Sequence, residues 1–162
     1  MTFYRRNLPH LQRDYKPHFV TFCTRDRWIL PTTVRALVLS CCIHDHEKKC
    51  HVHAAVVMPD HVHLLLTPMP NEDKREIYSL AELIGAIKGA SSHGINRKLG
   101  RSGHVWQEES FDHVLRRAEA LDEKMMYMLE NPVRAGIVGS AREYNWLWTA
   151  DPEIMGRFRV CN

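Results

Sequence analysis

No stretch of this sequence is hydrophobic over a length sufficient to cross a membrane. A transmembrane helix needs about 20 consecutive apolar residues, and no run in the 162-residue chain approaches that length. Residues 1–13 also lack the hydrophobic stretch of a secretory signal peptide. We therefore expect a cytoplasmic protein with no membrane partner.

The sequence also lacks the cysteine pattern of a disulfide-stabilised protein or a cysteine-bound zinc protein. Its five cysteines are odd in number, and no two of them form a C-x-x-C pair. A disulfide framework and a cysteine-based zinc site are therefore both disfavoured. We expect the cysteines to be reduced and mostly buried. They are Cys23, Cys41, Cys42, Cys50 and Cys161.

The excess of positive charge is small. The chain has 22 Lys and Arg against 19 Asp and Glu, a net charge of +3 with histidine neutral, which does not by itself indicate nucleic-acid binding. The distribution is uneven, because residues 5–27 contain six basic residues and only two acidic ones, Asp14 and Asp26. Such a basic segment suits phosphate binding, and a solvated surface explains it equally well.

The composition is that of one globular domain. With 44% hydrophobic and 25% charged residues, a chain of this length buries roughly 70% of its extended surface on folding. This is enough for a core that needs no metal, so any bound metal is expected to be functional. We expect a single domain over residues 1–162, with residues 140–162 forming a C-terminal extension packed on it.

Strand-like and helix-like patterns alternate along the chain. Strands are expected at residues 18–24, 52–58 and 61–67 and in a fourth region that comprises 105–107 and 110–115, with helices near 32–44, 80–99 and 118–130. The order β-α-β-β-α-β, followed by a helix, is that of the ferredoxin-like split βαβ fold. The predicted class is therefore α+β, an antiparallel sheet with helices and an added C-terminal helix that carries Tyr127.

Two histidines form a His-x-His pair on the third predicted strand. Residues two apart on a strand share a face, so His61 and His63 present two imidazoles side by side, a bidentate grip for a metal. If Pro59 and Asp60 form a two-residue turn, the register places His63 opposite Val56.

The same register places a second pair, His51 and His53, on the face of Val62. A site made of all four histidines is then disfavoured. A zinc hydrolase or zinc-structured protein built on them is a third interpretation, and no general base is visible beside the histidines.

The last predicted helix offers a second group of polar side chains. Its apolar stripe leaves Tyr127 and Asn131, four residues apart, on a different and shared face. A phenol hydroxyl and an amide oxygen can thus approach the same point. The alternative is that Tyr127 is a half-buried helix aromatic and Asn131 a C-terminal cap before Pro132. The stripe consists of Leu121, Met125, Met128 and Leu129.

Two separated blocks of this sequence resemble the HUH single-tyrosine transposases, and most closely the REP-associated tyrosine transposases. The first block is VMPDHVHLLL at residues 57–66, and the second is YMLENPVRAGIV at residues 127–138. Between them, Lys88 and residues 105–107 and 111–116 also resemble family motifs. The resemblance covers roughly residues 4–146, and two ordered blocks are more specific than either alone.

The resemblance implies a catalytic role for both groups of residues. It identifies His61 and His63 as ligands of a divalent metal, Mg²⁺ or Mn²⁺, and Tyr127 as the nucleophile. It also implies that Asn131 completes the metal site, where many single-tyrosine relatives carry Gln. The implied activity is cleavage and transfer of single-stranded DNA beside palindromic hairpins, through a 5′-phosphotyrosine.

Several basic or polar residues are candidates for contacts with the DNA backbone. By helical count Arg134 also lies on the side of Tyr127, although Pro132 interrupts that helix. A non-catalytic module that binds DNA hairpins stays an alternative, and both a monomer and a homodimer stay open. The candidates for backbone contacts are Arg5, Arg6, Lys88, His113, Arg116 and Arg117.

Overall fold

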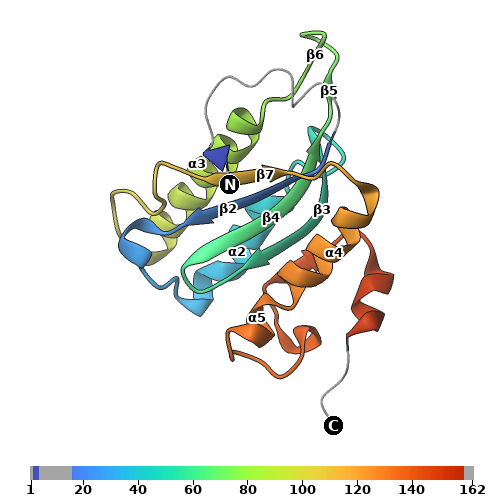
Figure 1. The fold of residues 1–162 in the computed structure, drawn as a ribbon. Helices are drawn as coiled ribbons and strands as arrows, with labels where there is room; N and C mark the ends of the chain where they lie inside the picture. Colours follow the sequence, from blue (N-terminus) through green and yellow to red (C-terminus); the bar gives the residue numbers. More distant parts are fainter. Residues whose placement is uncertain (1, 4–15, 159–162) are drawn as a thin grey trace.

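The computed structural model describes residues 2–3 and 16–158. Within them, six strands form one sheet in the order β1-β7-β2-β4-β3-β8, with every neighbouring pair antiparallel (Figure 1). The strands are β1 Thr2–Phe3, β2 His18–Cys23, β3 Cys50–Val57, β4 His61–Pro68, β7 Phe111–Val114 and β8 Leu147–Thr149. A small hairpin of β5 Pro70–Asn71 and β6 Glu76–Ile77 extends beyond β4.

The four central strands and the two helices α2 Thr32–Ile43 and α3 Leu80–Leu99 have the predicted topology. Two more α-helices, α4 Ala118–Leu129 and α5 Asn131–Arg134, follow β7. Because the central strands lie in the order β7-β2-β4-β3, α2 and α3 each connect two strands that have a third strand between them. The predicted α+β ferredoxin-like fold is confirmed, and β1 and β8 extend the sheet at its two edges.

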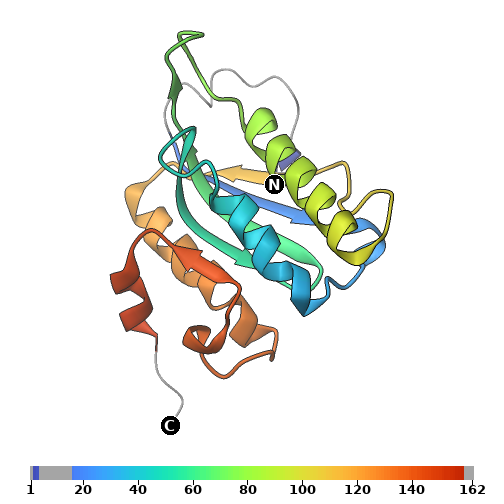
Figure 2. The same cartoon turned by 180° about the vertical axis from the view of Figure 1, so that it is seen from behind.

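Helices cover both faces of the sheet. α2 and α3 lie on one face and α4 on the other (Figures 1 and 2). Along β4, Val62 and Leu64 belong to the core under α2 and α3, whereas Leu65 belongs to the core under α4. Strand alternation then puts His61 and His63 on the face of Leu65. A shift of one residue would bury the histidines and expose Val62 and Leu64, so the apolar residues fix the register.

The ends of α3 follow from local chemistry. Ser79 accepts a hydrogen bond from the Glu82 N–H, and the Glu82 carboxylate accepts one from the Ser79 N–H, which is a complete capping box. At the other end Gly100 has a φ of 62°, the left-handed conformation that glycine adopts at low cost.

Within residues 2–3 and 16–158, no helix is both long and apolar enough to cross a membrane.

The C-terminal segment packs against the domain. β8 pairs with β3 and so adds a strand that the sequence patterns do not predict. Beyond it, Ile154 and Phe158 are buried in the same core as α4. Two 3-10 helices, η2 Ala141–Glu143 and η3 Pro152–Arg157, connect these parts.

One local prediction was wrong. Residues 105–107 form no strand and make only an isolated bridge, between Trp106 and Thr24. The predicted end of the helix before Asn131 is confirmed, since α4 ends at Leu129, and a further short helix, α5, begins at Asn131 with the proline in its first turn. Proline is tolerated there because the first helical N–H groups have no helical partner.

Candidate active site

His61 and His63 lie at the start of β4, directly after the turn formed by Pro59 and Asp60. A hydrogen bond of 2.8 Å from the Met58 N–H to the His61 carbonyl closes the turn. The two imidazole ring centroids are 4.7 Å apart. The structure thus places the two rings side by side on one face of the sheet.

Each of these imidazoles is held through its Nδ1 atom. His61 Nδ1 lies 2.7 Å from Asp60 Oδ1, and His63 Nδ1 lies 2.8 Å from Thr21 Oγ1. A carboxylate only accepts hydrogen bonds, so the proton of a neutral His61 sits on Nδ1. The Nε2 lone pair of His61 is then available to a metal, which is the usual arrangement at histidine-ligated sites.

The surroundings of Asp60 and His63 favour the protonation states that suit cation binding. Burial raises the pKa of Asp60, but the hydrogen bond from His61 and the charge of Arg27 outweigh it, and the pKa lies below its usual value. Burial lowers the pKa of His63 to about 3, helped by the charges of His61, Lys124 and Arg134. An anionic Asp60 and a neutral His63 therefore face the site at neutral pH.

Tyr127 lies in the last turn of α4 and is accessible. Met125, Met128 and Leu129 bury the opposite face of the helix, and 52% of the Tyr127 surface is exposed. Two cations lie over its ring. Lys124 Nζ is 5.0 Å from the ring centroid, and Arg134 Cζ is 3.9 Å from it.

A continuous series of contacts joins Tyr127 to the histidines. Lys124 Nζ, which lies over the Tyr127 ring, also lies 4.0 Å from the centroid of the Phe19 ring. Phe19 in turn stacks on His63, with ring centroids 5.3 Å apart. The nucleophile candidate and the two metal-ligand candidates therefore lie on the same side of the sheet within one chain.

Asn131 is the first residue of α5, one helical turn after Tyr127, and is partly buried. Within the residues that the structure describes, no hydrogen bond joins its side chain to His61 or His63. Its amide oxygen is chemically suited to a hard divalent cation. The role of Asn131 as a third ligand stays a prediction.

Lys88 is occupied by the protein itself. Its ammonium lies 2.9, 3.2 and 3.3 Å from the carbonyl oxygens of Gln107, Glu108 and Glu109. An ammonium has three protons, so these three acceptors use its full capacity. The structure gives Lys88 the task of holding the segment before β7, and we do not retain it as a contact to DNA.

His113 shares the sheet face of the histidine pair. It pairs with Phe19 across β7 and β2, and Phe19 pairs with Leu65 across β2 and β4. Directly opposed residues point to the same side of a sheet. His113 is exposed on that side, where DNA that reaches His63 would meet it.

The remaining predicted DNA contacts are farther away or outside the structure. Arg116 and Arg117 are exposed in the connection to α4, at the end of the sheet opposite to His61. Arg5 and Arg6 lie outside the described residues.

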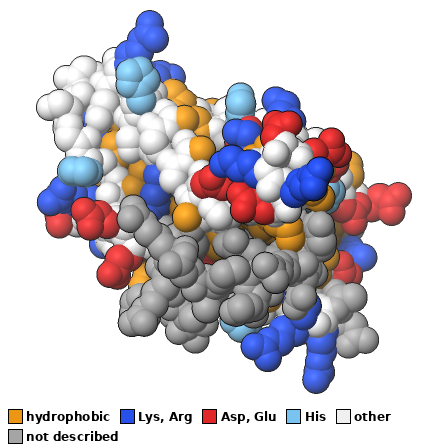
Figure 3. Space-filling view, turned by 90° about the horizontal axis from the view of Figure 1, so that it is seen from above, with side chains coloured by type: hydrophobic (Ala, Val, Ile, Leu, Met, Phe, Trp, Pro, Cys, Tyr) orange, Lys and Arg blue, Asp and Glu red, His pale blue; other side chains and the backbone are white. Residues whose placement is uncertain are grey.

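Seen from above, the molecule shows basic and acidic side chains interspersed (Figure 3). The charge of this face does not by itself mark a surface for nucleic acid.

The second histidine pair does not lie where the sequence predicts it. A register shift between Val52 and Ala54 leaves His53 as an extra residue on β3, so that His51 pairs with Thr67. His53 Nε2 also lies 2.8 Å from Thr67 Oγ1. The predicted placement of these histidines on the opposite face is wrong, because a bulge of one residue changes which side chains share a face.

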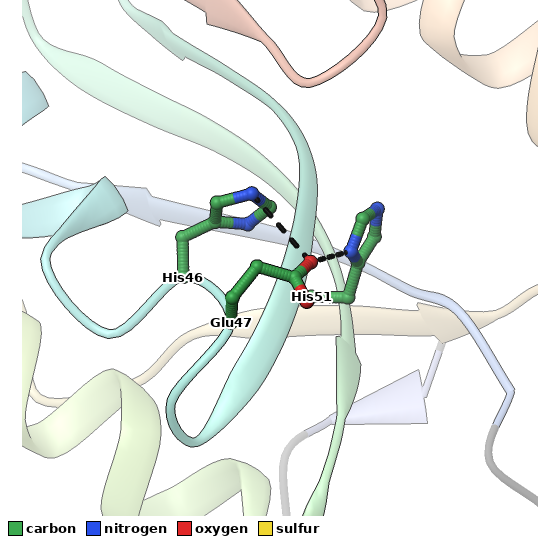
Figure 4. Close-up of side chains that lie close together, drawn as sticks. All are labelled: His46, Glu47 and His51. Carbon is green, nitrogen blue, oxygen red and sulfur yellow. Dashed lines mark hydrogen bonds and ion pairs between the residues drawn. The ribbon is translucent and has the colours of Figure 1, made fainter.

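The two histidine pairs still do not combine into one site. Thr67 shares its face with His63, but it is four residues farther along β4, about 13 Å at the rise of a strand. His51 belongs instead to a group at the start of β3, the end of the strand that is farther from His61, together with His46 and Glu47 (Figure 4). A zinc site built on both pairs is therefore not supported by the geometry.

The group at the start of β3 is held together by hydrogen bonding. Glu47 Oε1 contacts His51 Nδ1 and lies 3.6 Å from His46 Nε2. His46 Nδ1 accepts the Val52 N–H at 3.0 Å, so the proton of the neutral ring is on Nε2. His46 has no free lone pair for a metal, and we interpret the group as an ion-pair cluster.

Three residues at the site are missed by the sequence patterns. Lys124 has a usable signal, since it lies three residues before Tyr127 and thus on the same helix face. Phe19 and Thr21 have none, because their contacts with His63 depend on the pairing of β2 with β4.

Comparison with known proteins is consistent with this geometry. The family described as transposase IS200-like matches residues 12–120 of this chain. The matched segment contains His61 and His63 and ends before Tyr127. Over 95 residues the chain is 27% identical to a candidate REP-associated tyrosine transposase of Haemophilus influenzae, covering 56% of this chain and 54% of that protein. The chain thus spans about half the length of this curated relative.

The fold also has a solved counterpart. A REP-associated tyrosine transposase bound to a REP hairpin superimposes with a TM-score of 0.67 and 22% sequence identity, covering 91% of this chain and 82% of that one. At this level of identity the similarity is one of fold.

Proposed function

Because the chain belongs to the IS200-like transposase family, we propose that it cuts and rejoins single-stranded DNA beside palindromic hairpins. Tyr127 is the nucleophile in this proposal, and His61 and His63 hold the metal. The observation that carries it is the series of contacts from Tyr127 through Lys124 and Phe19 to His63. It brings a distant part of the sequence to the histidine pair.

The residues present fit a divalent cation. His61 and His63 are both held through Nδ1. The Asp60 carboxylate leaves the Nε2 lone pair of His61 for coordination, His63 offers the same lone pair in the tautomer that donates to Thr21 Oγ1, and Asn131 offers an amide oxygen. Two imidazoles favour Mn²⁺ over Mg²⁺ in affinity, and either ion accepts an oxygen ligand. When bound, the ion would offset the negative charge of the scissile phosphate and make its phosphorus more electrophilic.

The reaction exchanges one phosphoester for another. The Tyr127 oxygen attacks the phosphorus and loses its proton, while the bond from phosphorus to the 3′ oxygen breaks and that oxygen takes up one proton in exchange. The products are a 5′-phosphotyrosine and a free 3′-hydroxyl. A second 3′-hydroxyl can reverse the step, so strand transfer needs no ATP. Tyr127 is half exposed and therefore accessible to a DNA strand that lies along α4.

The proposed partner is hairpin DNA with a single-stranded flank. The structural relative is described as bound to a REP hairpin, and we extend this ligand to the present chain. His113 lies exposed on the face of the histidine pair, where it can contact the strand. Arg116 and Arg117, which are exposed in the connection to α4, are proposed as further contacts to the DNA backbone. Contacts of this kind position DNA without reading its sequence.

A covalent adduct tests the proposal. The protein is incubated with hairpin oligonucleotides from the DNA that flanks its gene, with Mg²⁺ or Mn²⁺, and run on a denaturing gel. A slower protein–DNA band is expected, and a chelator should abolish it. Tyr127→Phe removes only the hydroxyl and should give no band, whereas Tyr78→Phe, far from the histidines, is the matched control and should give the full band.

The outcomes separate the two candidate functions. An equal band from Tyr127→Phe contradicts the assignment of the nucleophile. Tight binding of the hairpin with no adduct under any divalent ion favours the non-catalytic binding module.

A further inference from the structure

The ring of Tyr127 lies against two cations of its own chain. Lys124 approaches from α4 and Arg134 from α5, with their charged groups 5.0 and 3.9 Å from the ring centroid. Lys124 also lies over the ring of Phe19, on the path to His63. Lys124 thus lies between Tyr127 and the histidine pair, and the charge of Arg134 also acts on His63.

Arg134 is fixed in place by the main chain of Tyr127. Its Nη2 atom donates a hydrogen bond of 2.6 Å to the Tyr127 carbonyl. The last carbonyls of an α-helix have no helical partner, and Arg134 satisfies one of them. A guanidinium has five N–H donors, so four remain for another ligand.

Among the side chains that the structure describes, neither cation has an acidic partner. Elsewhere on the surface, Arg27 pairs with Asp60 and Arg157 with Asp122, each at 2.9 Å. Within the described side chains, neither Lys124 nor Arg134 lies within 4.0 Å of a carboxylate.

This arrangement is costly without a counter-ion. Burial, and then the charge of Arg134, lower the pKa of Lys124. Two neighbouring like charges repel each other, and an anion that contacts both would relieve this repulsion.

We propose that Lys124 and Arg134 form a seat for one DNA phosphate, the phosphate that Tyr127 attacks. Arg134 joins the phosphate and the main chain of the nucleophile with a single planar group, which sets their relative position. Lys124 neutralises the phosphate from the side of Phe19 and His63. The identity of the phosphate rests on the proposed function, whereas the existence of an anion seat rests on the contacts alone.

A scan with neutral phosphates tests the seat without metal or catalysis. Each phosphate of a hairpin oligonucleotide is replaced in turn by an uncharged methylphosphonate. The affinity of each oligonucleotide for the Tyr127→Phe variant, which keeps the aromatic ring, is measured in the presence of EDTA. We expect one position at which the replacement weakens binding roughly ten- to hundredfold, the range for charge-assisted hydrogen bonds.

Variants then identify the residues that hold that phosphate. In a Tyr127→Phe protein that also carries Lys124→Gln and Arg134→Gln, the methylphosphonate at that position should weaken binding by less than about twofold, because the contact is already lost. Arg134→Lys keeps the charge and should retain part of the effect. Arg97→Gln, exposed near the end of α3 on the opposite side of the sheet, is the matched control and should retain all of it.

Two results would overturn the proposal. An unchanged sensitivity at every position in the Lys124→Gln/Arg134→Gln background overturns the seat itself. A sensitive position that differs from the bond cut when the wild type is given metal overturns the assignment of the seat to the attacked phosphate. If the wild type forms no adduct but the variants abolish the sensitivity, the proposed function fails while the anion seat stands.

Discussion

Replacing the Asp60 carboxylate should weaken metal binding without unfolding the protein. Asp60 Oδ1 contacts His61 Nδ1 at 2.7 Å, and Asp60 Oδ2 accepts a hydrogen bond from Arg27 Nε at 2.9 Å. The first contact keeps the His61 proton on Nδ1 and orients the ring. Asp60→Asn preserves an oxygen acceptor but removes the charge, whereas Asp60→Ala removes both.

The magnitude follows from the number of ligands affected. Loss of the partner of a ligating histidine typically weakens metal binding by about 10- to 100-fold. Only His61 is affected, because His63 is held by Thr21. We expect about tenfold for Asp60→Asn and closer to about 100-fold for Asp60→Ala. The ion pair with Arg27 is partly exposed, and its loss should cost about 0–1 kcal/mol of stability.

Calorimetric titration with Mn²⁺ measures the effect directly, without DNA. Asp45→Asn is the matched control, since Asp45 also contacts a neighbouring imidazole, that of His44 at 3.2 Å, but at the far end of the sheet. Its Mn²⁺ affinity should equal that of the wild type. The reasoning is refuted if Asp60→Ala binds Mn²⁺ as tightly as the wild type while His61→Ala does not bind it.

Four further predictions concern stability and the assignment of the site to one chain. Lys88→Met leaves three carbonyls without their donor and should lower the free energy of unfolding by about 1–3 kcal/mol in urea, with hairpin affinity unchanged. Leu64→Ala, at a fully buried position, should lower it by about 2–5 kcal/mol. Burial lowers the pKa of His53 to about 4, so the unfolded chain takes up a proton first as the pH falls below about 6.5. The urea midpoint should therefore fall between that pH and 4, and His53→Gln should flatten this part of the profile. A mixture of Tyr127→Phe and His61→Ala should form no adduct, because the contacts join the candidate nucleophile and the candidate metal ligands within one chain; restored adduct would place them on different subunits.

The sequence predicts those parts of the site that depend on local pattern. The turn at Pro59 and Asp60 joins two apolar strands, and alternation along the second decides the face of His61 and His63. The buried stripe of α4 likewise leaves Tyr127 as the exposed residue. In each case the burial of neighbouring apolar side chains fixes where the polar ones point.

The other features depend on contacts between distant segments. Nothing in the local pattern indicates that His53 is bulged, since both registers alternate equally well. Lys88 has the composition of a surface residue on a helix, and only the fold brings the carbonyls of residues 107–109 to it. β8 has three residues, too few for a periodicity to be recognised.

The backbone stays helical after Tyr127, and this explains why residues on both sides of Pro132 lie on the same side of the helix axis. Glu130, which links α4 to α5, has φ −80° and ψ −6°, within the right-handed helical region. The chain therefore keeps its helical direction through the proline, although the ladder of hydrogen bonds is interrupted. At about 100° per residue, positions four and seven beyond Tyr127 stay on its side of the axis. These positions are Asn131 and Arg134, so one interrupted helix directs the candidate nucleophile, a candidate metal ligand and a cation to the same side.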